Sequence, residues 1–283
     1  MKLIPVEGNT QKLDGGAMYG NAPKPMWEKW SAPDAQNRIS LACRSLLLVT
    51  DSGQKILFEA GIGAFFEPKL RERFGVVESE HCLVENLHKL GFAPEEIDDV
   101  ILSHLHFDHA GGILSRYEEG PLRLVFPKAR FHASRKNWER ALQPHPRDRA
   151  SFVPELNRLL QESGRLHLVD EEPHAALRGL VKFHWSDGHT PGLMMSEIAT
   201  PLGPLVFTSD LIPGSSWVHV PISMGYDRFP ELVIDEKRLL LESLVTRSAL
   251  LFYTHDPLMV CGRLQKDATG KFSSTPVDLA RVH

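Results

Sequence analysis

The sequence predicts one layered α/β domain over residues 1–283, with β-sheets inside and helices outside. Strand-like and helix-like segments alternate along the chain, no stretch of sequence repeats, and no polar linker divides it. The 283 residues are 42% hydrophobic and 24% charged, so the chain can bury a sizeable core and carries no tract typical of disorder. A fold built on packed sheets therefore accounts for the whole chain.

Charge, hydropathy and cysteine content exclude several classes of protein. The formal net charge is −4 and the isoelectric point is about 6.4, so the chain lacks the basic stripe of a general nucleic-acid-binding protein. Apolar runs such as Leu46–Val49 are far shorter than the ~20 residues of a membrane span, and the N-terminus turns polar before a signal peptide can form. Cys43, Cys82 and Cys261 form no CxxC pair, so we expect reduced thiols in a cytoplasmic protein.

The first third of the chain predicts an arm, a hairpin and a helix. Residues 1–40 are weakly periodic, and we expect an irregular N-terminal arm that packs on the protein, because Trp27 and Trp30 are costly to leave in water. Two apolar runs separated by Asp-Ser-Gly predict a β-hairpin over residues 44–61. Residues 80–91 place apolar side chains on one helical face and end in glycine, which predicts a helix.

Apolar runs and helical periodicity predict the remaining elements. The run DVILS, residues 99–103, is typical of a buried strand and leads into a cluster of histidines. Further strands are expected at Leu122–Phe126, Arg130–His132, Leu166–Val169, Leu180–Trp185, Met194–Ile198, Leu205–Thr208 and Leu250–Tyr253, and a hairpin after residue 255. Helices are expected at Arg135–Leu142, Phe152–Glu162 and Glu236–Val245, the last with Asp235 as its N-cap.

The stretch SHLHFDHAGG, residues 103–112, places three histidines and an aspartate within six positions. His104 and His106 alternate, so on the extended end of a strand they point to the same side. Asp108 and His109 lie beyond a turn, and the two glycines that follow leave room for tightly packed backbone. This spacing differs from that of the helical HExxH motif and predicts two neighbouring metals, one at His104 and His106 and the other at Asp108 and His109.

Three more candidate ligands stand where other apolar strands end. His189 lies in DGHTPG, Asp210 in FTSDLIP and His255 in YTHDP, and each begins a loop of the kind that carries function. Taken singly, each is as readily a turn residue, a capping aspartate or a histidine at the core edge. Together with the cluster they complete a set of five histidines and two aspartates. These ligand types suit zinc, while manganese, iron and cobalt stay open.

This ligand pattern resembles that of the metallo-β-lactamase-fold hydrolases over residues 44–255. Their HxHxDH motif matches residues 104–109, and their later His, Asp and His match His189, Asp210 and His255. The resemblance implies a four-layer αββα sandwich with the site at one edge. It also implies that Asp210 bridges two metals, with His104, His106 and His189 at the first and Asp108, His109 and His255 at the second.

Three positions refine what the resemblance implies. Glu59, in ILFEAGIG, replaces the aspartate of the family's usual DTG, and it is either a plain loop carboxylate or a support of the site. His106 stands where diiron redox members carry glutamate, and Asp210 favours lactonases, thioesterases and phosphoesterases over the zinc β-lactamases. We therefore expect two divalent cations to activate a bridging hydroxide, with Asp108 as the proton shuttle.

The stretches 15–30 and 208–231 resemble the branch of quorum-quenching lactonases and methyl parathion hydrolases. The resemblance implies a small, apolar ester-like substrate, best an N-acyl homoserine lactone, with Tyr226 or His219 orienting it. Pro213 stands where some lactonases carry a tyrosine. Apolar and aromatic residues that either wall a pocket or simply pack in the core are Met18, Tyr19, Phe65, Phe66, Trp217, Tyr226 and Phe229.

Other functions and assemblies remain open on the sequence. The same metal site serves a phosphotriesterase or aryl esterase, because attack on phosphorus or carbon uses the same metals. A metal-binding or sensor protein without turnover is a further alternative, although the complete ligand set favours an enzyme. The N-terminal arm can dock on its own chain or on a partner subunit, so a homodimer is open as well.

Overall fold

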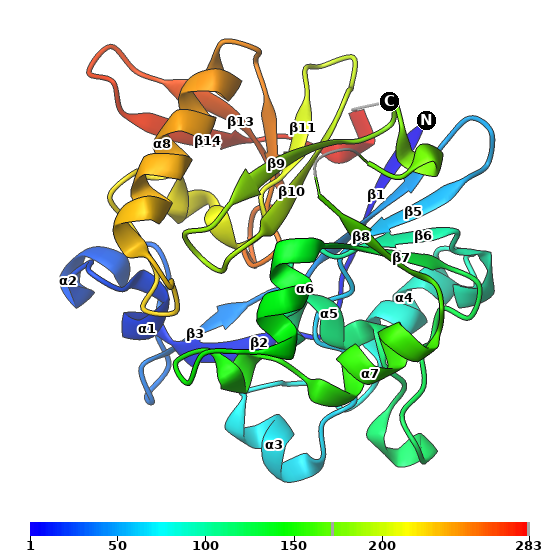
Figure 1. Cartoon of the computed structure of the whole chain (residues 1–283). Coiled ribbons are helices and arrows are strands. Elements are labelled where there is room, and N and C mark those ends of the chain that lie inside the picture. The colour runs from blue at the N-terminus through cyan, green and yellow to red at the C-terminus, as the bar shows by residue number, and fades with distance from the viewer. Residues whose placement is uncertain (171–172, 282–283) are drawn as a thin grey trace.

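Two six-stranded β-sheets form the centre of the fold (Figure 1). The description rests on a computed structural model that covers residues 1–170 and 173–281. The first sheet has the strand order β1-β4-β5-β6-β7-β8 and the second β14-β13-β12-β11-β10-β9, while β2 pairs with β3. The strands are β1 (Lys2–Val6), β2 (Gln11–Asp14), β3 (Arg38–Leu41), β4 (Ser45–Val49), β5 (Lys55–Phe58), β6 (Asp99–Ile101), β7 (Arg130–Ser134), β8 (Leu166–Val169), β9 (Lys182–Ser186), β10 (Leu193–Ile198), β11 (Leu205–Phe207), β12 (Leu250–Phe252), β13 (Cys261–Lys266) and β14 (Phe272–Pro276). The helices are α1 (Gly15–Tyr19), α2 (Lys24–Trp27), α3 (Pro68–Arg73), α4 (Cys82–Lys89), α5 (Phe107–Ala110), α6 (Arg135–Leu142), α7 (Pro154–Glu162) and α8 (Pro230–Val245).

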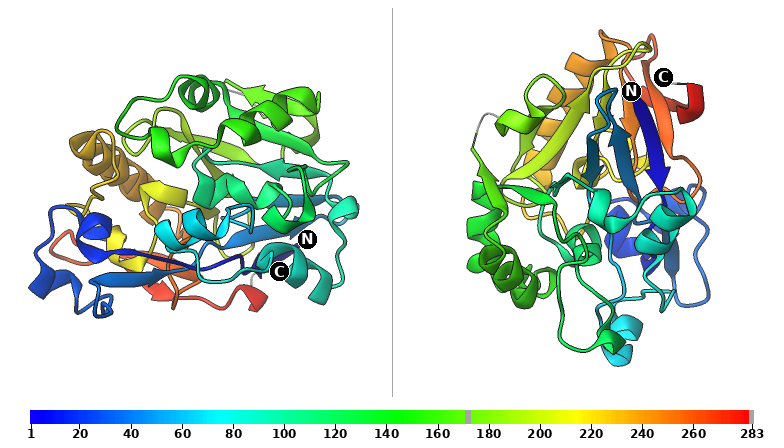
Figure 2. Two further views of the ribbon diagram at one scale, coloured as in Figure 1. Left: turned by 90° about the horizontal axis from the view of Figure 1, so that it is seen from below. Right: turned by 90° about the vertical axis from the view of Figure 1, so that its right-hand side faces the viewer.

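Both sheets are covered on both faces, which gives four layers (Figure 2). Leu46 and Leu48 of β4 share the core between the sheets with Phe207 of β11. The intervening Leu47 belongs to a second core that α4, α6 and α7 cover, because successive side chains of a strand point to opposite faces. The outer face of the second sheet packs on α8 through Leu241. The expected αββα sandwich is confirmed.

Most of the elements predicted from local pattern are present. β4 and β5 form the predicted hairpin around residues 50–54, and α4 covers the predicted helix, which His81 caps by accepting from the backbone N–H of Val84. β8 and α6 have the bounds that the sequence predicts. The C-terminal hairpin is formed by β13 and β14.

One predicted strand is absent, and one predicted helix is present but begins earlier than expected. Leu122–Phe126 is not a strand, although one isolated bridge joins Leu124 to Leu114. Its apolar side chains pack on the core of the first sheet. The apolar run therefore reflects burial of these side chains and does not mark a strand. Helix α8 begins at Pro230, well before the expected Glu236, because proline is favourable at the first helical position. Asp235 therefore lies inside the helix and does not cap it.

The N-terminal segment is regular, which corrects the expectation of an irregular arm over residues 1–40. β1 pairs with β4 as an edge strand, a position at which a proline such as Pro5 is tolerated. β2, β3, α1 and α2 follow. The ring of Tyr19 stacks on Trp27 at 5.7 Å and on Trp217 at 4.4 Å between centroids, so this segment is joined to the second sheet's core. Trp27 is buried, but Trp30 is exposed.

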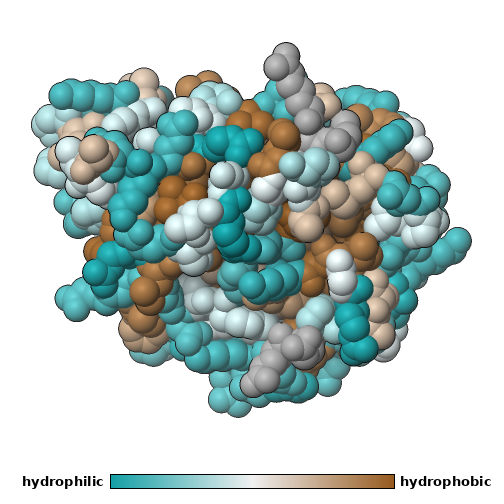
Figure 3. All heavy atoms as spheres, turned by 90° about the horizontal axis from the view of Figure 1, so that it is seen from above, coloured by the Kyte–Doolittle hydropathy of each residue, from teal (hydrophilic) through white to brown (hydrophobic). Residues whose placement is uncertain are grey.

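The surface and the cysteines complete the description. On the face shown in Figure 3, hydrophilic side chains surround smaller hydrophobic areas. Within residues 1–170 and 173–281, no helix is long and apolar enough to cross a membrane. Cys43 and Cys261 are buried free thiols, and Cys82 is half-buried and free.

Candidate metal centre

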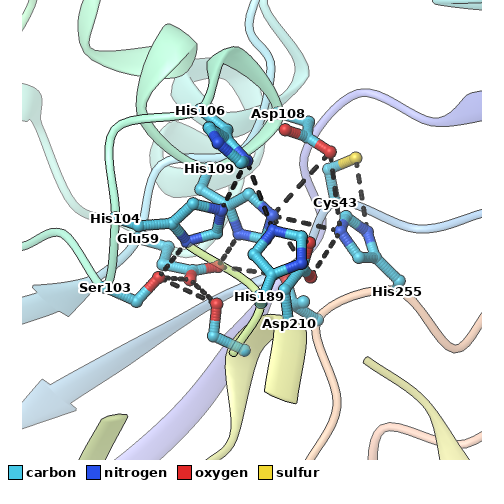
Figure 4. Close-up of polar contacts among 12 residues, drawn as sticks. Cys43, Glu59, Ser103, His104, His106, Asp108, His109, His189, Asp210 and His255 are labelled. Atoms are coloured by element: carbon cyan, nitrogen blue, oxygen red, sulfur yellow. Dashed lines mark hydrogen bonds and ion pairs between the residues drawn. The ribbon is translucent and has the colours of Figure 1, made fainter. Parts of the chain in front are cut away.

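The predicted ligands come from loops at one edge of the two sheets (Figure 4). β5 and β6 are parallel, as are β11 and β12, so the chain leaves neighbouring strands at a common edge. The structure brings all seven predicted ligands together there: His104 and His106 after β6, Asp108 and His109 in α5, His189 after β9, Asp210 in the 3-10 turn Ser209–Leu211 after β11, and His255 after β12.

The first donor set consists of three buried imidazoles. His106 Nδ1 lies 3.1 Å from His104 Nε2 and 3.3 Å from His189 Nε2. If His106 Nδ1 carries a proton it can donate it to only one of these two nitrogens at a time, whereas a cation placed between the three rings can accept a lone pair from each of them. Three histidines around one point are a familiar zinc-binding arrangement.

The second donor set combines two imidazoles and two carboxylates. His109 Nε2 and His255 Nε2 are 3.2 Å apart, and Asp108 Oδ2 lies 3.7 Å from each of them. Asp210 Oδ1 lies 3.3 Å from His109 Nε2 and 3.2 Å from His255 Nε2. Nitrogen and oxygen donors therefore meet at a second point next to the first.

Asp210 joins the two donor sets. Its Oδ2 lies 3.3 Å from His189 Nε2 in the first set, while Oδ1 faces the second. Oδ1 is buried and accepts no hydrogen bond from the described residues. A buried carboxylate oxygen is costly without a compensating positive charge. The donors and this unsatisfied oxygen together fit two divalent cations held side by side.

Hydrogen bonds behind the ligands orient two of the histidine rings. His189 Nδ1 lies 2.9 Å from Asp227 Oδ1, and the other oxygen of that carboxylate accepts from the backbone N–H of Met224 at 2.6 Å. His255 Nδ1 donates to the carbonyl of Ala42 at 2.6 Å. In both rings the bond at Nδ1 leaves Nε2 free to bind a metal, as is usual for metal-ligating histidines.

Glu59 supports the site, which decides between its two predicted roles. Its side chain is buried, and Oε2 lies 3.0 Å from His109 Nδ1. Oε1 accepts hydrogen bonds from the hydroxyls of Ser103 and Ser209, and Oε2 accepts one from Thr254 at 3.1 Å. These three hydroxyls and His109 surround the carboxylate, so it holds parts of the site together, and one of its oxygens also lies within 4.8 Å of donor atoms of His104 and His109. Its φ of +59° is a strained conformation for a side chain of this size, of the kind found at functional sites.

The histidines of the site fall into two groups by their pKa values, and the pKa of His189 of the first set is raised with the second group, because Asp210 and Asp227 outweigh its burial. Burial and neighbouring rings hold the pKa values of His104 and His106 well below the ordinary value, so both rings are neutral and able to offer a lone pair to a metal. Burial acts the same way on His109 and His255, but nearby carboxylates outweigh it and raise both pKa values well above the ordinary one. Burial disfavours the charged form of Asp210, yet these histidines outweigh it and lower its pKa. The second set therefore attracts positive charge strongly.

A cavity of about 420 Å³ leads to the donors. His106, Asp108, His189, Asp210 and His255 line its inner end. Its walls include Leu13, Met18, Leu41, Phe74, Phe107 and Met224, which come from the N-terminal segment, α3, α5 and the loop after β11. The volume and the mostly apolar walls are typical of a small-molecule site.

Only some of the residues that the sequence suggests for a pocket line the cavity. Met18 and Tyr226 line the cavity. The packing alternative holds for Tyr19, Phe65 and Trp217, which are buried in the cores, and for Phe66, which packs on a core. Phe229 is exposed. His219 does not line the cavity, and its carbonyl accepts from Lys237. Sequence reasoning missed Leu13, Leu41, Phe74, Arg73 and Arg147, which carry no local signal.

Comparison with known proteins identifies the family. Residues 41–255 match the profile of the metallo-β-lactamase superfamily. The chain belongs to this superfamily. Among curated members, an N-acyl homoserine lactonase of a Bacillus species is 27% identical over 205 residues, covering 69% of this chain and 68% of the relative. One from Bacillus cereus is 25% identical over 238 residues, covering 78% and 83%.

Solved structures of other proteins share the fold of this chain. A probable metal-dependent hydrolase from Staphylococcus aureus superposes with a TM-score of 0.86 at 24% identity, covering 98% of this chain and 97% of that one. AidC, a dizinc quorum-quenching lactonase in complex with a product, has a TM-score of 0.76 at 23% identity, covering 98% and 94%. The fold shared with these structures therefore extends over nearly the whole of this chain.

Proposed function

We propose that this metal-dependent hydrolase opens a lactone ring and that its substrate is an N-acyl homoserine lactone. The observation that carries the proposal is the position of two donor sets, joined by Asp210, at the inner end of a largely apolar cavity. The apolar walls suit an acyl chain, and the donors suit hydrolysis of the ester bond. The N-acyl homoserine lactonases among its relatives support the choice of substrate.

We assign two zinc ions as the cofactor. Histidine nitrogens and aspartate oxygens are the donors that zinc takes in such sites, and AidC is a dizinc enzyme. When bound, two such ions supply a nucleophile from water near neutral pH and offset negative charge that develops on a carbonyl oxygen. His104, His106 and His189 would hold one ion, and Asp108, His109 and His255 would hold the other, with Asp210 facing both donor sets.

Asp108 and Tyr226 are the side chains that we assign to the reaction besides the ligands. Asp108 lines the cavity and its side chain is 16% exposed, so it can pass a proton from the attacking water to the ring oxygen that leaves. Tyr226 lies in the cavity wall with its side chain part-exposed. Its hydroxyl can donate to a substrate carbonyl and orient the lactone ring.

An aryl esterase or phosphotriesterase activity is the second candidate. Phe74 and Phe107 in the cavity wall, with ring centroids 4.7 Å apart, offer an aromatic surface to an aryl group. Pro213 instead of a tyrosine also removes a hydroxyl that some lactonases have. Both observations concern the substrate and leave the metal chemistry unchanged.

Proton release by the metal-loaded protein separates these functions. A long-chain acyl homoserine lactone, a paraoxon-type triester and phenyl acetate are compared, each with a chelator-treated control. Lactone opening that far exceeds the other two and disappears with chelator supports the proposal. Faster turnover of the triester or aryl ester assigns the second candidate. Bound metal without turnover of any of the three contradicts both and favours a metal-binding protein.

A further inference from the structure

Two arginines lie in the wall of the cavity, and both are much more exposed to solvent than the buried donors. Arg73 is the last residue of α3, and Arg147 lies in the connection between α6 and α7, which runs above α3 in Figure 1. Both are exposed, whereas the ligands at the inner end are nearly all buried. The guanidinium groups therefore belong to the open end of the cavity.

Neither guanidinium is neutralised by the protein. Within residues 1–170 and 173–281, no carboxylate forms an ion pair with Arg73 or Arg147. The carboxylates that line the cavity face other groups, and one oxygen of Asp148 is buried without a hydrogen-bond partner among the described residues. Asp148 accepts from Arg140 Nε at 2.9 Å and Nη2 at 2.7 Å, and Asp108 and Asp210 face the ligand histidines. Two positive charges are thus left for a bound molecule.

Both arginines are held beside apolar wall. Arg147 Nη2 donates to the carbonyl of Gly225 at 2.9 Å, next to Tyr226 in the opposite segment of the wall. The guanidinium carbon of Arg73 lies 5.9 Å from the centroid of the Phe74 ring, which itself lines the cavity. The cavity consequently has three zones: buried donors, apolar walls and a cationic rim.

We propose that the cavity selects substrates that carry a carboxylate at the end remote from the bond that is cleaved. The inference rests on the proposed function, because that function places the reacting ester at the donors. An alkyl chain then lies along the apolar walls, and its terminal carboxylate meets Arg73 and Arg147 at the rim. Guanidinium groups bind carboxylates through paired, charge-assisted hydrogen bonds, and the same charges disfavour a cationic tail.

A matched pair of lactones tests the selection. N-octanoyl homoserine lactone and N-(7-carboxyheptanoyl) homoserine lactone have equally long acyl chains that end in a methyl group and a carboxylate. We expect kcat/KM of the metal-loaded enzyme to be about tenfold higher for the carboxylated lactone, since each partly exposed ion pair contributes a factor of about two to five. In the double variant Arg73→Gln/Arg147→Gln this ratio should fall to about one. Raising sodium chloride from about 50 to about 500 mM should lower the ratio in the wild type and not in the double variant.

The control variant is Arg71→Gln/Arg149→Gln. It removes the same charge from the same two segments, but neither Arg71 nor Arg149 lines the cavity. We expect it to keep the wild-type ratio and activity. The inference is overturned if the ratio of kcat/KM for the two lactones is unchanged in the double variant. It is also overturned if this ratio falls equally in the control variant, which would attribute the preference to general charge.

Failure of the proposed function can be recognised separately. If neither lactone is opened, octanoate and suberate are compared as inhibitors of whichever ester or triester the enzyme hydrolyses. Suberate carries the second carboxylate, so about tenfold stronger inhibition that disappears in the double variant supports the cationic rim on its own. Equal inhibition by the two acids contradicts it.

Discussion

Glu59 Oε2 lies 3.0 Å from Nδ1 of His109, and both side chains are buried. The same carboxylate accepts hydrogen bonds from residues that follow β6, β11 and β12. One side chain therefore holds a ligand ring and fixes the three loops that carry most of the other ligands.

We expect Glu59→Gln to weaken binding at the second donor set. The amide keeps the size of the side chain but loses the charge opposite His109, and such a loss typically costs about 10–100-fold in metal affinity. Metal content after dialysis against a weak chelator measures the effect. Asp99→Asn is the matched control, because Asp99 is also buried and paired with Arg130 and His132, away from the site. Equal metal loss in both variants would mean that Glu59 acts only through stability.

Asp210→Ala should abolish most hydrolysis and release at least part of the metal. The substitution removes the one carboxylate that faces both donor sets, so we expect kcat/KM to fall by at least about 100-fold. Elemental analysis beside the rate assay checks both effects. Full metal content with unchanged activity would contradict the bridging role.

Tyr226→Phe tests whether the phenol orients the substrate. A single hydrogen bond contributes about 0.5–1.5 kcal/mol, so kcat/KM should fall by roughly 3–10-fold while metal content stays unchanged. Tyr117→Phe, which removes an exposed phenol outside the cavity, is the control. If both variants keep the wild-type kcat/KM, Tyr226 only lines the wall.

Lys237 should make the free energy of unfolding rise with pH above about pH 7. Its side chain is fully buried beneath the loop after β11 and donates to the carbonyls of Ile222 and His219, and burial lowers its pKa from 10.5 to about 7. Below pH 7 both the folded and the unfolded chain hold the proton, so burying the charge destabilises the fold. Between pH 7 and 10.5 the folded chain releases the proton and the unfolded chain keeps it, so stability rises with pH.

Urea unfolding of the metal-loaded protein measures this dependence. The free energy of unfolding of the wild type relative to Lys237→Met should rise between about pH 7 and pH 9, by at most about 1.4 kcal/mol per pH unit. Lys182→Met, at an exposed position of β9, should show no such change relative to the wild type. A difference between wild type and Lys237→Met that stays constant with pH would refute the prediction.

The ligands were predictable because each one follows a strand with a clear local pattern. The alternation of His104 and His106 and the loop positions of His189, Asp210 and His255 are visible in short windows of sequence. Their convergence follows from parallel neighbouring strands, which end at the same edge. Glu59 was ambiguous because its three hydroxyl partners are distant in sequence, between 44 and 195 residues away.

The cavity walls and the N-terminal segment were not predictable in this way. β1 pairs with β4 through contacts of long sequence separation, and a short strand with a proline gives little periodic signal. Leu13, Phe74 and Arg147 line one cavity although they come from three segments that are far apart in the sequence. The start of α8 was misplaced because Asp235 resembles a cap, while Pro230 marks the true first turn.

The ligands of the metal centre are divided between the two sheets, so the centre depends on the packing of both halves of the chain. The half of the chain that forms the first sheet contributes residues 104–109, and the half that forms the second contributes His189, Asp210 and His255. Neither half alone presents a complete set of donors. The donor set is therefore complete, and the protein able to catalyse, only after both halves have folded and docked in the native orientation. Metal ions that bind this complete set stabilise the native arrangement relative to every other pairing of the same two halves.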